Sequence, residues 1–196
     1  MGNFSLPIKP PETVSGIVAG KKSGGGGHDI PVFYPATGNQ VSTLIEDSPE
    51  SVHAAVLAAR KAFDNGPWPK MPLQNRIQAL QSCGDLIAQN KDELARLECV
   101  ATGLVMRELV ERHIPRAAYN FKFFAEYVNQ ACGQRYDQTT GFLTTVTRMP
   151  VGVAALIAPW NAPLALATMK IAAALAFGNC CVVKPSEQTP FSLVKL

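Results

Sequence analysis

The spacing of hydrophobic and polar positions changes several times along the chain, and each change predicts a different kind of element. Residues 1–30 are rich in Gly and Pro and show little periodicity. Two short β-prone pieces, residues 32–34 and 40–45, flank a Pro and a Gly, which predicts a hairpin at the edge of a sheet. We interpret the Gly-rich run at residues 23–27 as a flexible turn, because the Lys and Ser/Thr of a phosphate-binding loop do not follow it.

The region of residues 48–133 has the periodicity of helices. Ser48 can cap a first helix, with Pro49 at its first position. The apolar positions of this helix are Val52, Val56, Ala59 and Phe63. A second helix is expected after Pro72, with the apolar face Leu73, Ile77, Leu80 and Ile87.

Two further helices are expected before the chain returns to strands. Asn90 and Glu93 have the spacing of a capping box, which predicts the start of a third helix that ends at Gly103. Pro115 lies inside the fourth periodic stretch, residues 108–131, so we expect a kink or a restart there. We interpret the aromatic residues of this stretch as core and helix packing: Tyr119, Phe121, Phe123, Phe124 and Tyr127.

The last third of the chain predicts a β-α-β-α unit. Residues 142–148 alternate Thr with apolar residues, as a half-exposed strand would, whereas residues 151–157 and 180–183 are continuous apolar runs typical of strands covered on both faces. A helix with the stripe Leu164, Ile171 and Leu175 lies between these runs, and Gly178 closes it. Another helix begins at Thr189 and Pro190. The fold class is therefore α/β, with two parallel strands joined by a right-handed crossover.

The specific chemistry is concentrated in the two turns that follow the parallel strands. Ligands of open parallel sheets bind outside the carboxyl ends of the strands, so residues 158–161 and 184–187 should lie side by side. Asn161 offers an amide beside a helix start, Lys184 a cation, and Glu187 an acceptor for ribose hydroxyls. This set predicts a nucleotide site. The alternative is that Asn161 only caps the helix and that Lys184 and Glu187 are a surface ion pair.

Composition and charge exclude several classes of function. Hydrophobic residues make up 47% and charged residues 17% of the 196 positions, which is ordinary for a soluble globular protein. A net charge of +3 on scattered Lys and Arg indicates neither nucleic acid nor a lipid surface as partner. Five irregularly spaced cysteines do not form a secreted disulfide framework, and neither a membrane-spanning run nor a signal peptide is present. These features predict a cytoplasmic location. They indicate no metal site.

Several motifs in order resemble the aldehyde dehydrogenase superfamily. They are PWN at residues 159–161, the helix with Lys170, GN at residues 178–179, and KPSEQTP at residues 184–190. The similarity continues back through PATG at residues 35–38 and AARKAF at residues 58–63, and so covers nearly the whole chain. Members of the superfamily are about two and a half times as long, so the resemblance implies the N-terminal part of such an enzyme, with a parallel Rossmann-like sheet that is incomplete here.

The resemblance implies roles for particular residues. Asn161 matches the side-chain amide of the oxyanion hole, and Lys170 matches a lysine assigned to a proton relay, although a plain structural role fits its helical position equally well. The cofactor contacts that it implies are Ile157, Ala158, Pro159, Trp160, Asn161, Lys184, Pro185, Ser186 and Glu187. Glu187 favours a free 2'-hydroxyl and would repel a 2'-phosphate, so NAD is expected in preference to NADP, which remains possible.

The implied substrate is an aldehyde. Ala162, Leu166 and Met169 match positions that line the aldehyde tunnel. Residues 113–127 are similar to a segment of muconic-type semialdehyde dehydrogenases in which an arginine meets the substrate carboxylate. Arg116 is the candidate for that contact, with a solvated helix arginine as the alternative.

The resemblance also implies four segments in this chain and implies that some catalytic residues lie beyond position 196. The segments are an N-terminal arm and hairpin (1–47), the helical part of the cofactor domain (48–134), an oligomerisation-type strand (135–149) and the first β-α-β-α of the NAD-binding domain (150–196). Homodimers or tetramers are expected of the intact enzyme. The nucleophilic Cys and general-base Glu of the superfamily lie beyond Leu196, so the chain alone should be inactive. The alternatives are a non-catalytic interaction module that docks onto full-length subunits, and an acyl-phosphate or acyl-CoA reductase of the same fold.

Overall fold

The structure is a computed structural model that describes residues 5–196. Its N-terminal part is a small sheet in which β5 (Asn39–Asp47) lies between β1 (Thr13–Val14) and β4 (Gly26–Tyr34). β4 and β5 are antiparallel, which confirms the predicted hairpin. β2 (Ile17–Val18) and β3 (Lys21–Lys22) form a second, two-stranded sheet. The interpretation of the Gly-rich run as a flexible turn holds only in part. Gly26 is already the first residue of β4 and pairs with Asp47.

α1 (Pro49–Asn65) begins where the sequence predicts, with the Ser48 side chain accepting a hydrogen bond from the Ser51 backbone N–H. Its apolar stripe is less buried than expected, since only Ala59 is buried, and Val52 and Val56 are 50% and 42% exposed. The short 3-10 helix η1 (Trp68–Lys70) follows at the predicted break. In the described residues, therefore, α1 presents an open apolar surface.

α2 (Leu73–Gln89) and α3 (Lys91–Thr102) also begin where predicted, and Gly103 ends α3 in a left-handed conformation. The expected capping box is wrong. Asn90 has backbone angles unlike those of a cap, and its side chain donates to the carbonyl of Leu86 in the preceding helix. Asn90 therefore serves both helices: its side chain completes the first, and its backbone carbonyl accepts the Leu94 N–H of the second at 3.0 Å.

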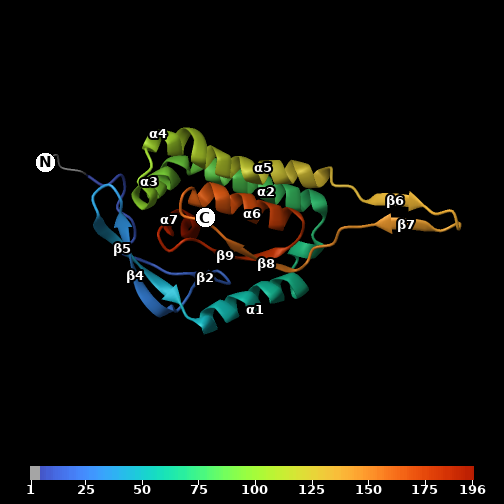
Figure 1. The fold of residues 1–196 in the computed structure, drawn as a ribbon, viewed down its shortest axis with the longest axis horizontal. Coiled ribbons are helices and arrows are strands. Elements are labelled where there is room, and N and C mark those ends of the chain that lie inside the picture. Colours follow the sequence, from blue (N-terminus) through green and yellow to red (C-terminus); the bar gives the residue numbers. More distant parts are fainter. Residues whose placement is uncertain (1–4) are drawn as a thin grey trace.

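Pro115 does interrupt the fourth helical stretch. A short helix α4 (Met106–Glu108) leads into a turn of π-helix η2 (Leu109–His113), and α5 (Ile114–Asn129) restarts with Pro115 in its first turn. α5 packs closely on α2 at Gly84, where a Cβ would lie 2.9 Å from the carbonyl oxygen of Ala118. The helices α2, α5 and α6 form one layer in Figure 1.

The interpretation of the α5 aromatic residues as core is wrong for three of the five. Phe121 is buried and Phe124 partly so, but Tyr119, Phe123 and Tyr127 are 52%, 41% and 55% exposed. Their four-residue spacing puts them on one outer face of the helix, where their ring centroids are about 6 Å apart. Helical periodicity identifies such a stripe but does not reveal whether another element covers it.

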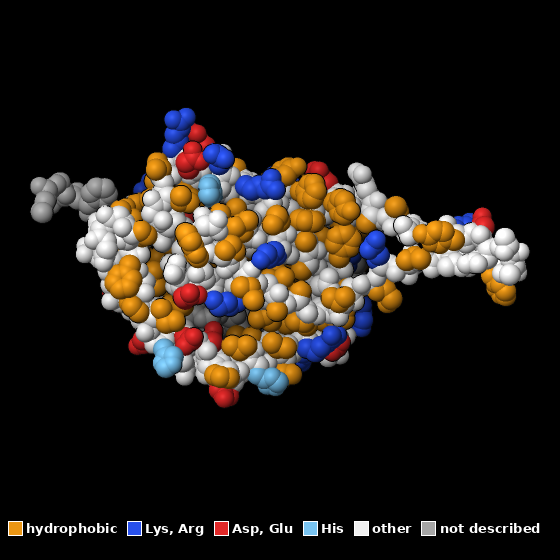
Figure 2. Space-filling view, in the orientation of Figure 1, with side chains coloured by type: hydrophobic (Ala, Val, Ile, Leu, Met, Phe, Trp, Pro, Cys, Tyr) orange, Lys and Arg blue, Asp and Glu red, His pale blue; other side chains and the backbone are white. Residues whose placement is uncertain are grey.

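The segment between α5 and the parallel strands is a projecting hairpin. β6 (Gln134–Asp137) pairs antiparallel with β7 (Leu143–Val146), and all eight residues are exposed. The sequence predicts β7 as half-exposed. Figures 1 and 2 show that the hairpin extends away from the body, which leaves neither face of it covered.

The C-terminal part contains the predicted β-α-β-α unit. β8 (Val153–Ile157) and β9 (Cys180–Lys184) are parallel neighbours, α6 (Pro163–Ala176) connects them, and α7 (Phe191–Lys195) follows. α6 and α1 contact opposite sides of the strand pair (Figure 1). The strands are nevertheless only half-buried, and Ile157 is 66% exposed. The expectation of full burial is wrong because this sheet has only two strands within residues 5–196, so both flanks remain open.

Two clusters of buried side chains form the core. The larger joins α2, α3, α5 and α6, with Leu80, Leu109, Ile114 and Leu164 among its fully buried members. The smaller joins the N-terminal sheet to α3 and α7 through Val32, Val100 and Phe191. No helix within residues 5–196 is both long and apolar enough to cross a membrane.

Candidate functional site

The carboxyl ends of β8 and β9 lie side by side, as the topology predicts. Ile157 is paired with Lys184 in the register of the two strands, and the backbone N–H of Ala158 donates to the carbonyl of Lys184 at 2.9 Å. This bond joins the two turns that carry the candidate chemistry. Ala158 is buried beneath them, while Trp160 is 58% exposed.

Asn161 does not cap the following helix. The N-cap residue of α6 is Ala162, Pro163 is the first helical residue, and the Asn161 side chain is exposed. Among the described residues the amide of Asn161 has no hydrogen-bond partner. The capping alternative therefore fails, and the amide is free to donate to a ligand.

Glu98 supplies the contact that Asn161 does not make. This α3 residue is 1% exposed, and its Oε1 accepts hydrogen bonds from the backbone N–H of Leu164 at 2.7 Å and from Ser192 Oγ at 2.8 Å. Burial raises the pKa of the Glu98 carboxyl, and the two hydrogen bonds oppose that rise. Sequence reasoning missed this residue, although a signal exists. Glu98 occupies the apolar face of α3 with Leu94, Leu97 and Ala101, where a carboxylate needs a partner.

Lys170 reaches back from α6 to the end of β8. Its ammonium group is exposed and donates to the carbonyl of Ile157. This contact places the lysine beside the turn that carries Asn161 and ties the helix to the strand. A proton relay through Lys170 stays a prediction.

Lys184 and Glu187 form an exposed ion pair at the end of β9. The Lys184 Nζ and Glu187 Oε2 are 3.0 Å apart, and the side chains are 62% and 47% exposed. The backbone N–H of Glu187 and then Lys184 hold the pKa of the Glu187 carboxyl below its usual range. Pro185 is half-buried, and Ser186 is buried with its hydroxyl accepting from the Gln188 N–H at 3.3 Å. The charged groups of this turn therefore face outward, while the Ser186 hydroxyl is engaged within the turn.

The candidate substrate residues lie near the start of α5 and along the first half of α6. Ala162 and Leu166 are half-buried and Met169 is 38% exposed. Asn120 of α5 donates to the carbonyl of Ala165 at 2.8 Å, and further along both helices Tyr127 meets Phe177. These contacts show that the two helices run parallel.

Arg116 lies one helical turn before Asn120, at the end of α5 that flanks the start of α6. Its side chain is exposed, and the guanidinium carbon is 5.7 Å from the centroid of the Tyr119 ring. The guanidinium is in no ion pair among the described residues. The geometry therefore leaves Arg116 available to a ligand.

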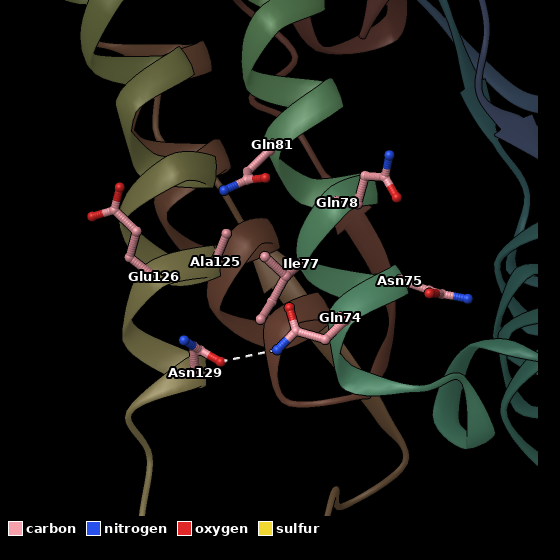
Figure 3. A pocket seen from close by; sticks show the side chains of 8 residues that line it. All are labelled: Gln74, Asn75, Ile77, Gln78, Gln81, Ala125, Glu126 and Asn129. Atoms are coloured by element: carbon pink, nitrogen blue, oxygen red, sulfur yellow. Dashed lines mark hydrogen bonds between the residues drawn. The ribbon is translucent and has the colours of Figure 1, made fainter.

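A groove of about 500 Å³ between α2 and α5 lies elsewhere. It is lined mostly by amides, and Gln74 Nε2 donates to Asn129 Oδ1 at 3.2 Å across it (Figure 3). None of the residues that line it is a predicted site residue. The open groove is thus distinct from the turns of β8 and β9.

The cysteines offer no activated thiol near Asn161. All five are free, and Cys180 and Cys181 are half-buried in β9, less than the sequence suggests. Desolvation raises the pKa of both thiols, which keeps them protonated and weakly nucleophilic. Among the described residues no group of three or more His, Cys, Asp and Glu side chains could hold a metal ion.

Comparison with known proteins identifies relatives over most of the chain. The chain is 38% identical over 162 residues to the 5-carboxymethyl-2-hydroxymuconate semialdehyde dehydrogenase of Escherichia coli, covering 83% of the chain and 34% of that protein. It is 37% identical over 187 residues to the 2-hydroxymuconic semialdehyde dehydrogenase of Pseudomonas sp. (strain CF600), covering 93% and 38%. The chain thus spans about a third of the length of these relatives.

The fold agrees with the same relationship. An aldehyde dehydrogenase from Bacillus cereus, solved as an NAD+ complex, superposes with a TM-score of 0.83 at 35% identity, over 87% of this chain and 35% of that one. The gamma-glutamyl-gamma-aminobutyraldehyde dehydrogenase of Burkholderia cenocepacia gives a TM-score of 0.88 at 33% identity, over 94% and 37%. The model of the aldehyde dehydrogenase family matches residues 22–196. With its α/β fold, the chain therefore belongs to the aldehyde dehydrogenase family.

Proposed function

We propose that this chain supplies the oxyanion donor and part of the dinucleotide site of an enzyme that oxidises an aldehyde to a carboxylic acid with NAD. The observation that carries the proposal is the exposed, unpaired amide of Asn161 at the carboxyl end of β8, beside the start of α6. The nucleophile and the general base would come from residues beyond Leu196. The chain alone would then be inactive.

The role of Asn161 follows from the chemistry of the reaction. Attack of a thiolate on an aldehyde carbonyl turns its oxygen into an oxyanion, which needs a hydrogen-bond donor that is already in place. The Asn161 side-chain N–H is such a donor because no protein acceptor within residues 5–196 competes for it. A donor of this kind is commonly worth about 3 kcal/mol of transition-state stabilisation.

The turn after β9 fits the ribose of a dinucleotide. Lys184 and Glu187 present a cation and a carboxylate 3.0 Å apart at the surface, and a pair of ribose hydroxyls can donate to the carboxylate and accept from the lysine. A 2'-phosphate would be repelled by Glu187, which favours NAD over NADP. Backbone groups of residues 157–161, with Pro185 and Ser186, would line the rest of this half-site. NAD supplies the acceptor for the hydride when it is bound.

The substrate that fits best is a semialdehyde with a carboxylate at its far end. Arg116 would bind that carboxylate. Ala162, Leu166 and Met169 would contact the carbon chain of the substrate between its carboxylate and its aldehyde group. The names of two relatives support this assignment, because both are dehydrogenases of muconic-type semialdehydes. The small side chain of Ala162 leaves room for a wide substrate.

The projecting hairpin is the element that we assign to self-association in the intact enzyme. β6 and β7 expose Tyr136, Leu143 and Val146 to solvent. Burying such apolar side chains lowers the free energy, so an exposed cluster of them indicates a contact surface. A homodimer or tetramer would cover them. We place the enzyme in the cytoplasm, where the five free cysteines of this chain would stay reduced.

The test is an assay of the full natural protein that contains this chain, with NAD or NADP and a panel of semialdehydes and neutral aldehydes. We expect NADH to form fastest with an anionic semialdehyde, and Asn161→Ala to lower kcat about a hundredfold. Asn129→Ala is the matched control, because Asn129 lies at the far end of α5. Absence of NADH formation over the whole panel would refute the proposal.

A further inference from the structure

α6 begins without a cap of its own. The first backbone N–H groups of any helix have no partner inside the helix. At the start of α6 the N-cap position holds Ala162, whose methyl group cannot accept a hydrogen bond. Asn161, which has a suitable side chain, points it to solvent. The helix therefore depends on an acceptor from another element.

Glu98 is that acceptor. Its Oε1 meets the N–H of Leu164, the second residue of α6, at 2.7 Å. The same oxygen accepts from Ser192 of α7, whereas Oε2 has no hydrogen-bond partner within the described part of the chain. A carboxylate at this position also faces the positive end of the helix dipole. One buried side chain thus joins α3, α6 and α7.

The opposite end of α6 is held in a complementary way. Trp68 Nε1 donates to the carbonyl of Leu175 at 3.2 Å, and Arg76 Nε donates to that of Ala176 at 3.0 Å. The helix thus has a carboxyl oxygen as acceptor at its N-terminus, and an indole and a guanidinium as donors at its C-terminus. A shift of α6 along its axis would break contacts at both ends. Its first turn, and the residues joined to it, are therefore fixed relative to α2 and α3.

We propose that Glu98 is a positioning residue for aldehyde oxidation. By capping α6 from α3 it fixes the start of the helix, and so the amide of Asn161 three residues before Leu164. Because Glu98 provides the cap, the Asn161 amide is left free for the substrate oxygen. This inference rests on the proposed role of Asn161 as the oxyanion donor.

The capping contact can be tested without catalysis, by hydrogen exchange of backbone amides in the full natural protein. Glu98→Leu removes the acceptor, whereas Glu98→Gln keeps an oxygen at the same place. We expect the exchange protection factor of the Leu164 amide to fall about tenfold in E98L and to stay unchanged in E98Q. Glu93→Leu is the matched control, because Glu93 lies on the same helix and pairs with Lys195 at the surface, 3.1 Å away. Unchanged protection of Leu164 in E98L would overturn the assignment.

The catalytic part needs a double-mutant cycle in the full natural protein. We expect E98L to lower kcat about a hundredfold while the KM for NAD is unchanged, and E98Q to restore most of the rate. In an Asn161→Ala background E98L should lower kcat by less than about threefold, because its effect depends on the position of the Asn161 amide. An equal loss in both backgrounds would show a general structural role and overturn the proposal.

Two outcomes separate this inference from the function on which it rests. A wild-type enzyme that oxidises no aldehyde would refute the proposed function, and the catalytic role of Glu98 with it, whereas the exchange experiment would still decide the cap. If E98L does not fold, Glu98→Asp replaces it. That variant keeps a carboxyl group but withdraws it by one methylene, and it should show the same dependence on Asn161.

Discussion

The Asn120 side chain donates a hydrogen bond of 3.0 Å to Thr168 Oγ1, and both residues are buried where α5 packs against α6. Thr168 Oγ1 in turn donates to the carbonyl of Leu164, and Asn120 also donates to that of Ala165. This small polar network links the helix that carries Arg116 to the helix that follows Asn161. It fixes the relative position of the two helices more specifically than apolar contacts would.

Replacing Asn120 with Leu should therefore destabilise the fold. The substitution removes two donors and leaves Thr168 Oγ1 without one of its partners, so we expect a loss of about 1–3 kcal/mol in the free energy of unfolding. Urea unfolding followed by circular dichroism measures it. Asn75→Leu, at an exposed position of α2, should change the free energy by less than about 0.5 kcal/mol. Equal effects of the two substitutions would contradict the network.

The stability of the chain should depend on pH through Glu98. Burial raises the pKa of its carboxyl in the folded state, so between the ordinary and the raised pKa the folded state binds more protons than the unfolded state. The contribution of the group is then fully present below the ordinary carboxyl pKa and is lost as pH rises through the raised value. We expect the free energy of unfolding of the wild type, measured relative to that of Glu98→Gln, to fall as pH rises through this window. A difference between the two that does not vary with pH would exclude this linkage.

Arg116 should determine the preference for anionic substrates in the full natural protein. Arg116→Leu removes the positive charge that would meet the substrate carboxylate, so the KM for a semialdehyde acid should rise about tenfold or more. The KM for a neutral aldehyde of similar length should hardly change. Arg112→Leu is the control, because Arg112 pairs with Glu108 at 3.0 Å on the preceding turn. If R116L raises the KM for both substrates alike, the arginine does not bind the substrate carboxylate.

Glu187 should set the preference between the two dinucleotides. Neutralising it in Glu187→Gln removes the repulsion of a 2'-phosphate and leaves Lys184 free to attract it. We expect the ratio of kcat/KM for NADP to that for NAD to rise about tenfold. Steady-state assays with both cofactors measure this ratio, and Glu126→Gln on the far part of α5 serves as the charge control. A ratio that stays at the wild-type value would place the ribose elsewhere.

Local signals in the sequence were sufficient for most elements. Ser48 with Pro49 starts α1, Gly103 ends α3, and Pro115 lies in the first turn of α5, directly after the π-turn. The parallel pair of β8 and β9 follows from two continuous apolar runs around a helical stripe. These features succeed because caps, breakers and periodicity act over a few residues and depend little on the rest of the fold.

Burial was harder to predict, because it depends on which elements meet. Tyr119, Phe123 and Tyr127 form an apolar stripe that stays largely exposed, and the two-stranded sheet leaves Ile157 exposed. Glu98 escaped notice for the same reason. Its partners, Leu164 and Ser192, are far away in sequence, and only the folded chain brings them to its carboxylate. The residues that carry the proposed chemistry were readable from motifs, whereas the residue that holds them in place was not.

The open flanks of β8 and β9 have a consequence for handling the protein. Within residues 5–196 each of these strands pairs on one side only, so the other side of each presents unpaired backbone donors and acceptors. Sheet edges of this kind serve as templates for pairing with another chain. At high concentration the 196-residue chain should therefore associate edge to edge. A charged residue introduced on an outer strand is the remedy that natural sheets themselves use.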